Sequence, residues 1–256
     1  MRLTFDNGWQ ATVTNSPLPI TPRFSGNSVD IADYADVKER ERFLQATFGS
    51  QGLLWDTPDV VRFDRDSRNL AGTEFQVPGA SASAEDSARV PVLPAVRPGG
   101  LRADEARDFR LEACEVLCRA PGDAVLTCLR DLDVLDEPLE ARIGIAPDVA
   151  LLVQRGTVVG WSLTDPARYL TQAFTAPDPD PPFPTTRRLL TECLDLITEP
   201  VIDDVMDREP AALARLRAVN DDLRNQREDR HRADALLALI ADLVEDYADL
   251  PPRQKP

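Results

Sequence analysis

The chain has 256 residues, of which 43% are hydrophobic, so it is long enough and apolar enough to fold around a core of normal size. Its formal net charge is −15, from 44 acidic and 29 basic residues. A surface field of that sign repels nucleic-acid phosphates and anionic lipid headgroups, so neither nucleic acid nor a membrane surface is an expected partner. Basic proteins and cations stay open as partners.

The N-terminus lacks the apolar segment of a signal peptide, and no window approaches the roughly 18 uninterrupted apolar residues of a membrane span. We therefore expect a soluble, cytoplasmic protein. Without an export signal, the four cysteines are expected to be reduced and mostly buried; they are Cys114, Cys118, Cys128 and Cys193.

The first segment predicts a β-hairpin, because Asp6-Asn7-Gly8 separates two strand-like runs and Asn-Gly is a strong turn signal. Apolar residues then recur at helical spacing, which predicts a helix over 34–48 with Gly49 as its stop. A second hairpin is expected within 52–78, where a polar turn over 64–69 divides two apolar runs.

Residues 79–88 are rich in serine and alanine and are expected to form a loop, since nothing in them can anchor a core. The firmest sheet prediction is an antiparallel meander over 142–164, whose apolar runs are split by Pro147-Asp148 and Arg155-Gly156. The stretch 109–119 contains good helix formers, yet it precedes a turn where a hairpin partner belongs, and we favour a strand.

From residue 184 the apolar spacing becomes helical, and Pro184 and Pro200 each mark a helix start. No Gly or Pro occurs from 211 to 250, so that segment is either one helix of about 60 Å or a helical hairpin. Its charged middle, 224–232, is expected to be exposed to solvent and cleaved early by trypsin.

Together these patterns predict an α+β protein, with antiparallel sheets built from hairpins and a meander over residues 1–165. We expect a β-rich domain over 1–175 with one helix at 34–48. A helical region over 184–250 would pack on it or project from it, and 251–256 would be a disordered tail.

Searches for common catalytic signatures fail. The chain has no P-loop, no Gly-x-Gly-x-x-Gly, no Gly-x-Ser-x-Gly, no Cys-x-x-Cys and no His-Glu-x-x-His, so no cofactor is expected. His231 is the only histidine, and its Glu-x-x-His motif cannot form a di-iron site, which needs two such motifs. We interpret His231 as a solvated residue on a charged helical face.

Two sets of carboxylates are candidates for chemistry. Asp64 and Asp66 follow an apolar strand, which is one way of presenting carboxylates to Mg²⁺, although a polar hairpin turn explains them better. Glu192, Asp195, Glu199 and Asp203 recur at steps of three and four residues and would form an acidic stripe if 184–206 were nearly continuous helix. Pro200 argues against that continuity.

We expect a non-catalytic, acidic protein-interaction protein, of the inhibitor, immunity, antitoxin, chaperone or adaptor kind, with a basic protein as its partner. The alternative is a carboxylate-based enzyme, with or without Mg²⁺ dependence, that uses Asp64 and Asp66 or the Glu192–Asp203 set. The segment 211–250 could also support a homodimer. The residues expected to contact a partner are Glu192, Asp195, Glu199, Asp203, Arg224, Arg227 and Arg230.

Overall fold

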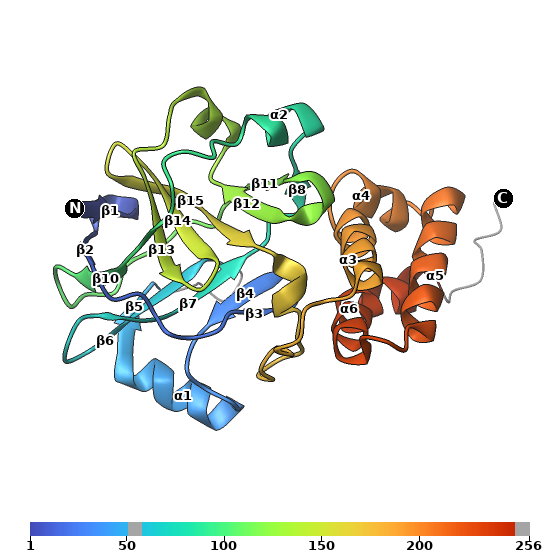
Figure 1. Ribbon diagram of the computed structural model, residues 1–256, viewed down its shortest axis with the longest axis horizontal. Helices are drawn as coiled ribbons and strands as arrows, with labels where there is room; N and C mark the ends of the chain where they lie inside the picture. Colours follow the sequence, from blue (N-terminus) through green and yellow to red (C-terminus); the bar gives the residue numbers. More distant parts are fainter. Residues whose placement is uncertain (51–57, 249–256) are drawn as a thin grey trace.

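The computed structural model describes residues 1–50 and 58–248, so the predicted tail at 251–256 and the first part of the predicted 52–78 segment lie outside the described residues. The protein is α+β, with two sheets, mostly antiparallel, and a group of C-terminal helices. In Figure 1 these helices lie together on one side of the sheets, while α1 and α2 lie at opposite edges of the sheet region.

The larger sheet has ten strands in the described residues. Its path runs β10-β2-β1-β15-β12-β11-β8, and β14, β13 and β9 extend from the other side of β15. All pairs are antiparallel except β1–β15, β8–β11 and β9–β13. The strands are β1 (Arg2–Thr4), β2 (Gln10–Thr14), β8 (Ala80–Ser81), β9 (Arg97–Pro98), β10 (Gly100–Ala103), β11 (Val116–Arg119), β12 (Val125–Leu129), β13 (Ala141–Ala146), β14 (Val149–Gln154) and β15 (Thr157–Thr164).

The predicted meander and the predicted N-terminal hairpin are confirmed in this sheet. Strands β13, β14 and β15 pair in sequence, and β1 pairs with β2 across the short 3-10 turn η1 (Asp6–Gly8). The strand favoured within 109–119 is observed only at its end, as β11. The remaining 3-10 turns are η2 (Pro121–Asp123), η3 (Leu132–Asp136) and η4 (Pro166–Tyr169).

The smaller sheet is antiparallel, in the order β3-β4-β7-β6-β5. Its strands are β3 (Arg23–Phe24), β4 (Ser28–Ile31), β5 (Thr47–Gly49), β6 (Val60–Asp64) and β7 (Leu70–Gln76), so the predicted second hairpin is observed as β6–β7. The predicted helix over 34–48 is α1 (Val37–Ala46). It begins later than predicted because Asp36 caps it by accepting a hydrogen bond from the Glu39 N–H, and the Glu39 side chain accepts one from the N–H of the preceding residue, Ala35.

The prediction of a loop over 79–88 is wrong. Residues in that stretch form β8, which pairs with β11, and a short helix, α2 (Ala84–Arg89). Ser83 caps α2 by accepting a hydrogen bond from the Asp86 N–H at 3.0 Å. A segment without core-forming side chains therefore still acquires structure from a cap and from strand pairing.

Aromatic side chains fill the space between the two sheets. Trp9 from the larger sheet lies 5.1 Å from Phe63 of β6, between ring centroids, and Trp161 of β15 stacks on Phe75 of β7 at 5.2 Å. These four side chains are at most 2% exposed. Because these four side chains are large and buried, they contribute strongly to the hydrophobic stabilisation of the sheet region.

The helical region consists of α3 (Pro184–Ile197), α4 (Val201–Met206), α5 (Pro210–Asn225), α6 (Arg230–Leu243) and a terminal turn, η5 (Val244–Ala248). The predicted helix starts near Pro184 and Pro200 are confirmed. The segment from 211 onward is a helical hairpin, because α5 and α6 are separated by residues 226–229.

The expectation that 224–232 is exposed is wrong in part, since Gln226, Asp229 and Arg232 are buried. Arg232 is only 1% exposed, and its Nη1 donates to both carboxylate oxygens of Asp229 at 3.1 and 3.2 Å. Its Nη2 donates to the carbonyl oxygens of Asp178 and Asp180. One arginine of the charged run therefore holds the segment that precedes α3 in place by hydrogen bonds.

A buried polar network joins the helical region to the larger sheet. Arg119 of β11 donates from Nε and Nη2 to the carboxylate of Asp123, and from Nη1 to Asp195 of α3. Its Nη2 also donates to the carbonyl oxygen of Thr191. The helices therefore pack on the sheets through paired charges.

Helix α6 also touches two segments of the sheet region. Gln172 donates from its side chain to the carbonyl oxygen of Asp234 at 2.6 Å. The turn between β3 and β4 lies against Leu239, because a Cβ added at Gly26 would come within 2.3 Å of that side chain.

Within residues 1–50 and 58–248, no helix combines the length and the apolar character needed to cross a membrane.

Candidate functional site

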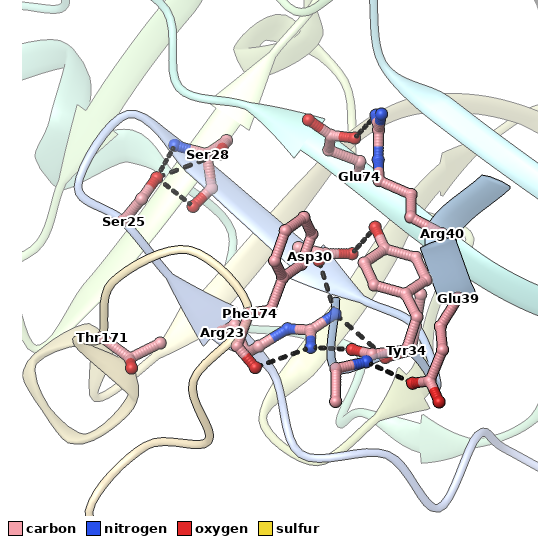
Figure 2. Close-up of polar contacts among 12 residues, drawn as sticks. Arg23, Ser25, Ser28, Asp30, Tyr34, Glu39, Arg40, Glu74, Thr171 and Phe174 are labelled. Atoms are coloured by element: carbon pink, nitrogen blue, oxygen red, sulfur yellow. Dashed lines mark hydrogen bonds and ion pairs between the residues drawn. The ribbon is translucent and has the colours of Figure 1, made fainter. Parts of the chain in front are cut away.

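The outer face of the smaller sheet carries two adjoining cavities, of about 290 and 240 Å³, which we together call the α1 cleft. Asp30, Tyr34, Arg40 and Glu74 line both of them. The first cavity is also lined by Ala32, Phe43, Leu44, Ser50, Val60, Arg62 and Thr73, and the second by Arg23, Ser25, Ser28, Thr171, Ala173 and Phe174. Figure 2 shows the four residues that the two cavities share, together with residues of the second cavity and the polar contacts among them.

Strand alternation and register place these charged residues side by side. Side chains along a strand point alternately to the two faces of a sheet. In β4, Val29 and Ile31 are buried in the core, so Asp30 projects from the opposite face. Asp30 is paired with Arg23 on one side and with Glu74 on the other, and Glu74 is paired in turn with Val60.

Asp30 is the most fully hydrogen-bonded carboxylate of the cleft. It accepts a hydrogen bond from Arg23 Nη2 at 2.6 Å and another from the Tyr34 hydroxyl at 3.0 Å. Arg23 also donates to the carbonyl oxygens of Ala32, Tyr34 and Phe174. Burial raises the pKa of Asp30 above its usual value, although the Arg23 charge opposes that shift.

The Tyr34 side chain lines both cavities of the cleft. Its ring makes edge contacts with Phe43 and Phe174 at centroid distances of 5.5 and 5.7 Å, and the Arg23 guanidinium lies 4.8 Å from its centroid. Burial and then the Asp30 charge raise the pKa of Tyr34 above its usual range. The Tyr34 hydroxyl therefore stays protonated and acts as a donor to Asp30.

Arg40 and Glu74 form a more open pair at the same place (Figure 2). Arg40 Nη2 lies 3.3 Å from Glu74 Oε2, and the two side chains are 43% and 29% exposed. Arg40 also interacts with the Tyr34 hydroxyl. Among the described residues, the second carboxylate oxygen of Glu74 has no hydrogen-bond partner.

Helix α1 covers the cleft without packing tightly on the sheet. Among the described residues of α1, none is buried, and Val37 and Leu44 are 60% and 37% exposed. Phe43 reaches the sheet at Gly72, where an added Cβ would come within 2.9 Å of its ring. The helix is therefore held by the Phe43 contact, by the Arg40–Glu74 pair and by hydrogen bonds from Arg62 and Arg65 to carbonyl oxygens of its last turn, while the rest of it leaves space above the sheet.

Arg62 lines the first cavity and lies at the C-terminal end of α1. It is 9% exposed, and it donates to the Thr47 hydroxyl and to the carbonyl oxygens of Leu44, Thr47 and Ser50. These contacts cap the C-terminal end of α1, where a positive charge is favourable. Burial lowers the pKa of Arg62 below its usual value.

A comparison with protein-family models, with curated proteins and with solved structures finds no match to this chain. The chemistry of the α1 cleft is therefore inferred from its geometry.

The structure places Asp64 and Asp66 together in the turn between β6 and β7, outside the α1 cleft. Asp64 accepts hydrogen bonds from the N–H and hydroxyl of Ser67, and these hold its pKa below the usual value. Asp66 is exposed. Within residues 1–50 and 58–248, no group of three or more His, Cys, Asp or Glu side chains is arranged to hold a metal ion.

The continuous helix that the acidic stripe requires is not formed, since α3 ends at Ile197 and α4 begins at Val201. Glu192 pairs with Arg188 at 2.6 Å. Asp195 pairs with both Arg119 and Arg215. Glu199 and Asp203 are exposed beyond the end of α3.

The three arginines predicted to contact a partner lie where α5 meets α6, and all three are exposed. Arg224 donates to the Asn220 side chain, and Arg230 pairs with Asp234. His231, on the same helix as Arg230, is exposed as predicted.

The sequence analysis did not single out Arg23, Asp30, Tyr34, Arg40 or Glu74. One signal was present, because Ser28-Val29-Asp30-Ile31 alternates polar and apolar residues and so predicts a strand with a charged outer face. The partners of Asp30 come from distant segments, and no spacing in the sequence brings them together.

Proposed function

We propose that this chain is a non-catalytic binding protein and that the α1 cleft holds its ligand. The observation that carries this proposal is the pair of adjoining cavities, about 290 and 240 Å³, which share four polar side chains beneath a loosely seated helix. Concave sites with a few convergent polar groups are the usual form of small-molecule sites.

The state of the polar groups favours binding over catalysis. The two oxygens of Asp30 each accept a hydrogen bond, one from Arg23 and one from Tyr34, so this carboxylate is held in a fixed, charge-paired arrangement. The four cysteines and His231 are absent from the residues that line the cleft. Preformed and mutually paired charges orient a ligand well, but they do not constitute an activated nucleophile and base.

A thermal-shift screen with a library of small metabolites tests this proposal. A compound present at about a hundred times its dissociation constant stabilises the folded protein by ~2.7 kcal/mol, which raises the melting temperature by about 5–10 °C. We expect at least one such compound, and we expect Arg40→Gln to abolish its effect. The matched control is Arg188→Gln, which removes another partly exposed arginine–glutamate pair far from the cleft. The proposal is overturned if no compound acts, or if every active compound stabilises Arg40→Gln equally.

A second candidate function, recognition of a basic protein, is favoured by the corner formed by α4 and the start of α5. Met206 is 53% exposed there, and exposed acidic residues surround it in the sequence; these are Asp203, Asp204, Asp207 and Glu209. An apolar anchor within an acidic surface suits a partner of opposite charge.

This candidate predicts that a stoichiometric basic protein purifies with the chain and associates more slowly as salt is added. Replacing Asp203 and Asp207 by lysine should lower the association rate by about tenfold, since electrostatic steering changes such rates by ~10–1,000-fold. Asp66→Lys, on the exposed β6–β7 turn, is the control. Association that is insensitive to salt and to the two α4 changes would exclude this surface.

A further inference from the structure

We infer that the α1 cleft binds a free α-amino acid with an apolar side chain, held in its zwitterionic form. This inference rests on the proposed function and names the class of ligand. Three observations support this ligand class. They are the hydrogen-bonding groups of the cleft that have no partner among the described residues, the apolar side chains that line the first cavity, and the charged side chains of the cleft.

The unused groups are of opposite charge and adjacent. Glu74 engages Arg40 through Oε2 only, so its other oxygen can accept from a ligand ammonium. Arg40 makes one contact of 3.3 Å to Glu74 and also interacts with the Tyr34 hydroxyl, and its remaining guanidinium N–H groups can donate to a ligand carboxylate. Asp30 already accepts from Arg23 and Tyr34, and its charge is paired with that of Arg23, so Glu74 is the more available carboxylate.

The first cavity has apolar walls next to the unused groups of Arg40 and Glu74. Ala32, Phe43, Leu44 and Val60 line it together with the polar residues. Its volume of about 290 Å³ lies just below the range of roughly 300–1,000 Å³ that is usual for ligand sites, which suits a ligand smaller than a drug-sized molecule. A ligand of amino-acid size would place its apolar side chain against α1 and complete the loose packing of that helix.

Arg62 is a second positively charged side chain, besides Arg40, that lines the first cavity. In the described residues its hydrogen bonds go to neutral oxygens, and Nη1 makes one long bond, of 3.4 Å, to the Ser50 carbonyl. It can therefore support a ligand carboxylate without losing its contacts to the end of α1.

Charge balance favours a zwitterion over a singly charged molecule. Arg23 compensates the charge of Asp30, so an anion at Arg40 would be repelled by the adjacent Glu74, whereas a cation at Glu74 would be repelled by Arg40 and Arg62. A ligand that carries an ammonium and a carboxylate on one carbon satisfies Glu74 and Arg40 together. The weak direct contact between those two side chains is then replaced by two charge-assisted hydrogen bonds.

Isothermal titration calorimetry with L-leucine and L-methionine tests the inference from the ligand side. We expect one or both to bind at millimolar concentration or below. We expect 4-methylpentanoate, which lacks the amine of leucine, and 3-methylbutylamine, which lacks its carboxylate, to bind at least about tenfold more weakly, because each loses a hydrogen bond to a charged group. Glycine, which lacks the side chain, should also bind more weakly. Absence of binding by both amino acids, or equal binding of the truncated analogues, overturns the inference.

Variants test it from the protein side. Arg40→Gln and Glu74→Gln should each weaken amino-acid binding by about tenfold or more, whereas Arg188→Gln should leave it unchanged. If other metabolites bind in a way that depends on Arg40 while the amino acids do not, the amino-acid inference fails and the proposed function stands. If no compound depends on Arg40, both fail. The analogue series keeps the inference testable even if a variant does not fold.

Discussion

Asp229→Ala is expected to destabilise the protein by about 3–5 kcal/mol, because it leaves the buried guanidinium of Arg232 without its carboxylate. Asp229 is 5% exposed and Arg232 is 1% exposed, so water cannot replace the lost partner. The Thr186 hydroxyl, which donates to Asp229 at 2.7 Å, also loses its acceptor. Urea unfolding followed by helical circular dichroism measures the change in the free energy of unfolding.

Asp234→Ala is the matched control, since Asp234 lies on the same helix and pairs with Arg230. The side chains of that pair are 41% and 43% exposed, so its loss should cost about 1 kcal/mol or less. If both variants lost the same small amount, the buried pair would not be a principal support of the helical region.

Asp59→Asn is expected to stabilise the protein above about pH 6 by up to ~3 kcal/mol, since one pKa unit corresponds to ~1.4 kcal/mol. Asp59 is 3% exposed, and burial raises its pKa to about 6, although hydrogen bonds from the Gln76 N–H and the Cys114 thiol oppose the shift. Above that pH the wild-type protein must hold a buried negative charge that asparagine does not carry.

The direction in which stability changes with pH follows from the raised pKa of Asp59. Between the unfolded value of 3.8 and the folded value of about 6, the folded state retains a proton that the unfolded state has released. The contribution of Asp59 to stability is therefore greatest below pH 4, falls as the pH rises to about 6, and is constant above that. Unfolding by urea at a series of pH values should show this decline in the wild type minus variant difference. A difference for Asp59→Asn that does not change with pH would contradict the expectation.

Local patterns predicted much of the fold. Turn residues and alternation indicated both hairpins and the meander, and proline positions indicated the starts of α3 and α4, because these elements depend on neighbouring residues. Alternation could not reveal that β1 pairs in parallel with β15, since that contact joins the two ends of the sheet region. It also could not reveal α2, which depends on one serine cap.

The cleft was less predictable than the fold. Its row of charges arises from the register of β3, β4 and β7, and register between distant strands is set by the whole core. The arginine-rich run near Arg232 looked solvated because a charged sequence usually is. Its burial depends on carbonyl oxygens of Asp178 and Asp180, some fifty residues away, which no local pattern indicates.

Helix α6 supports two walls of the second cavity, the β3–β4 turn with Ser25 and Ser28 and the segment with Thr171 and Phe174. A ligand that displaces either wall would also act on α6, and a partner that displaces α6 would act on the cavity. By thermodynamic linkage the two effects are equal in free energy. The helical region and the second cavity are thus in direct contact, so a displacement of α6 is transmitted to the walls of the cavity through Gln172 and the β3–β4 turn.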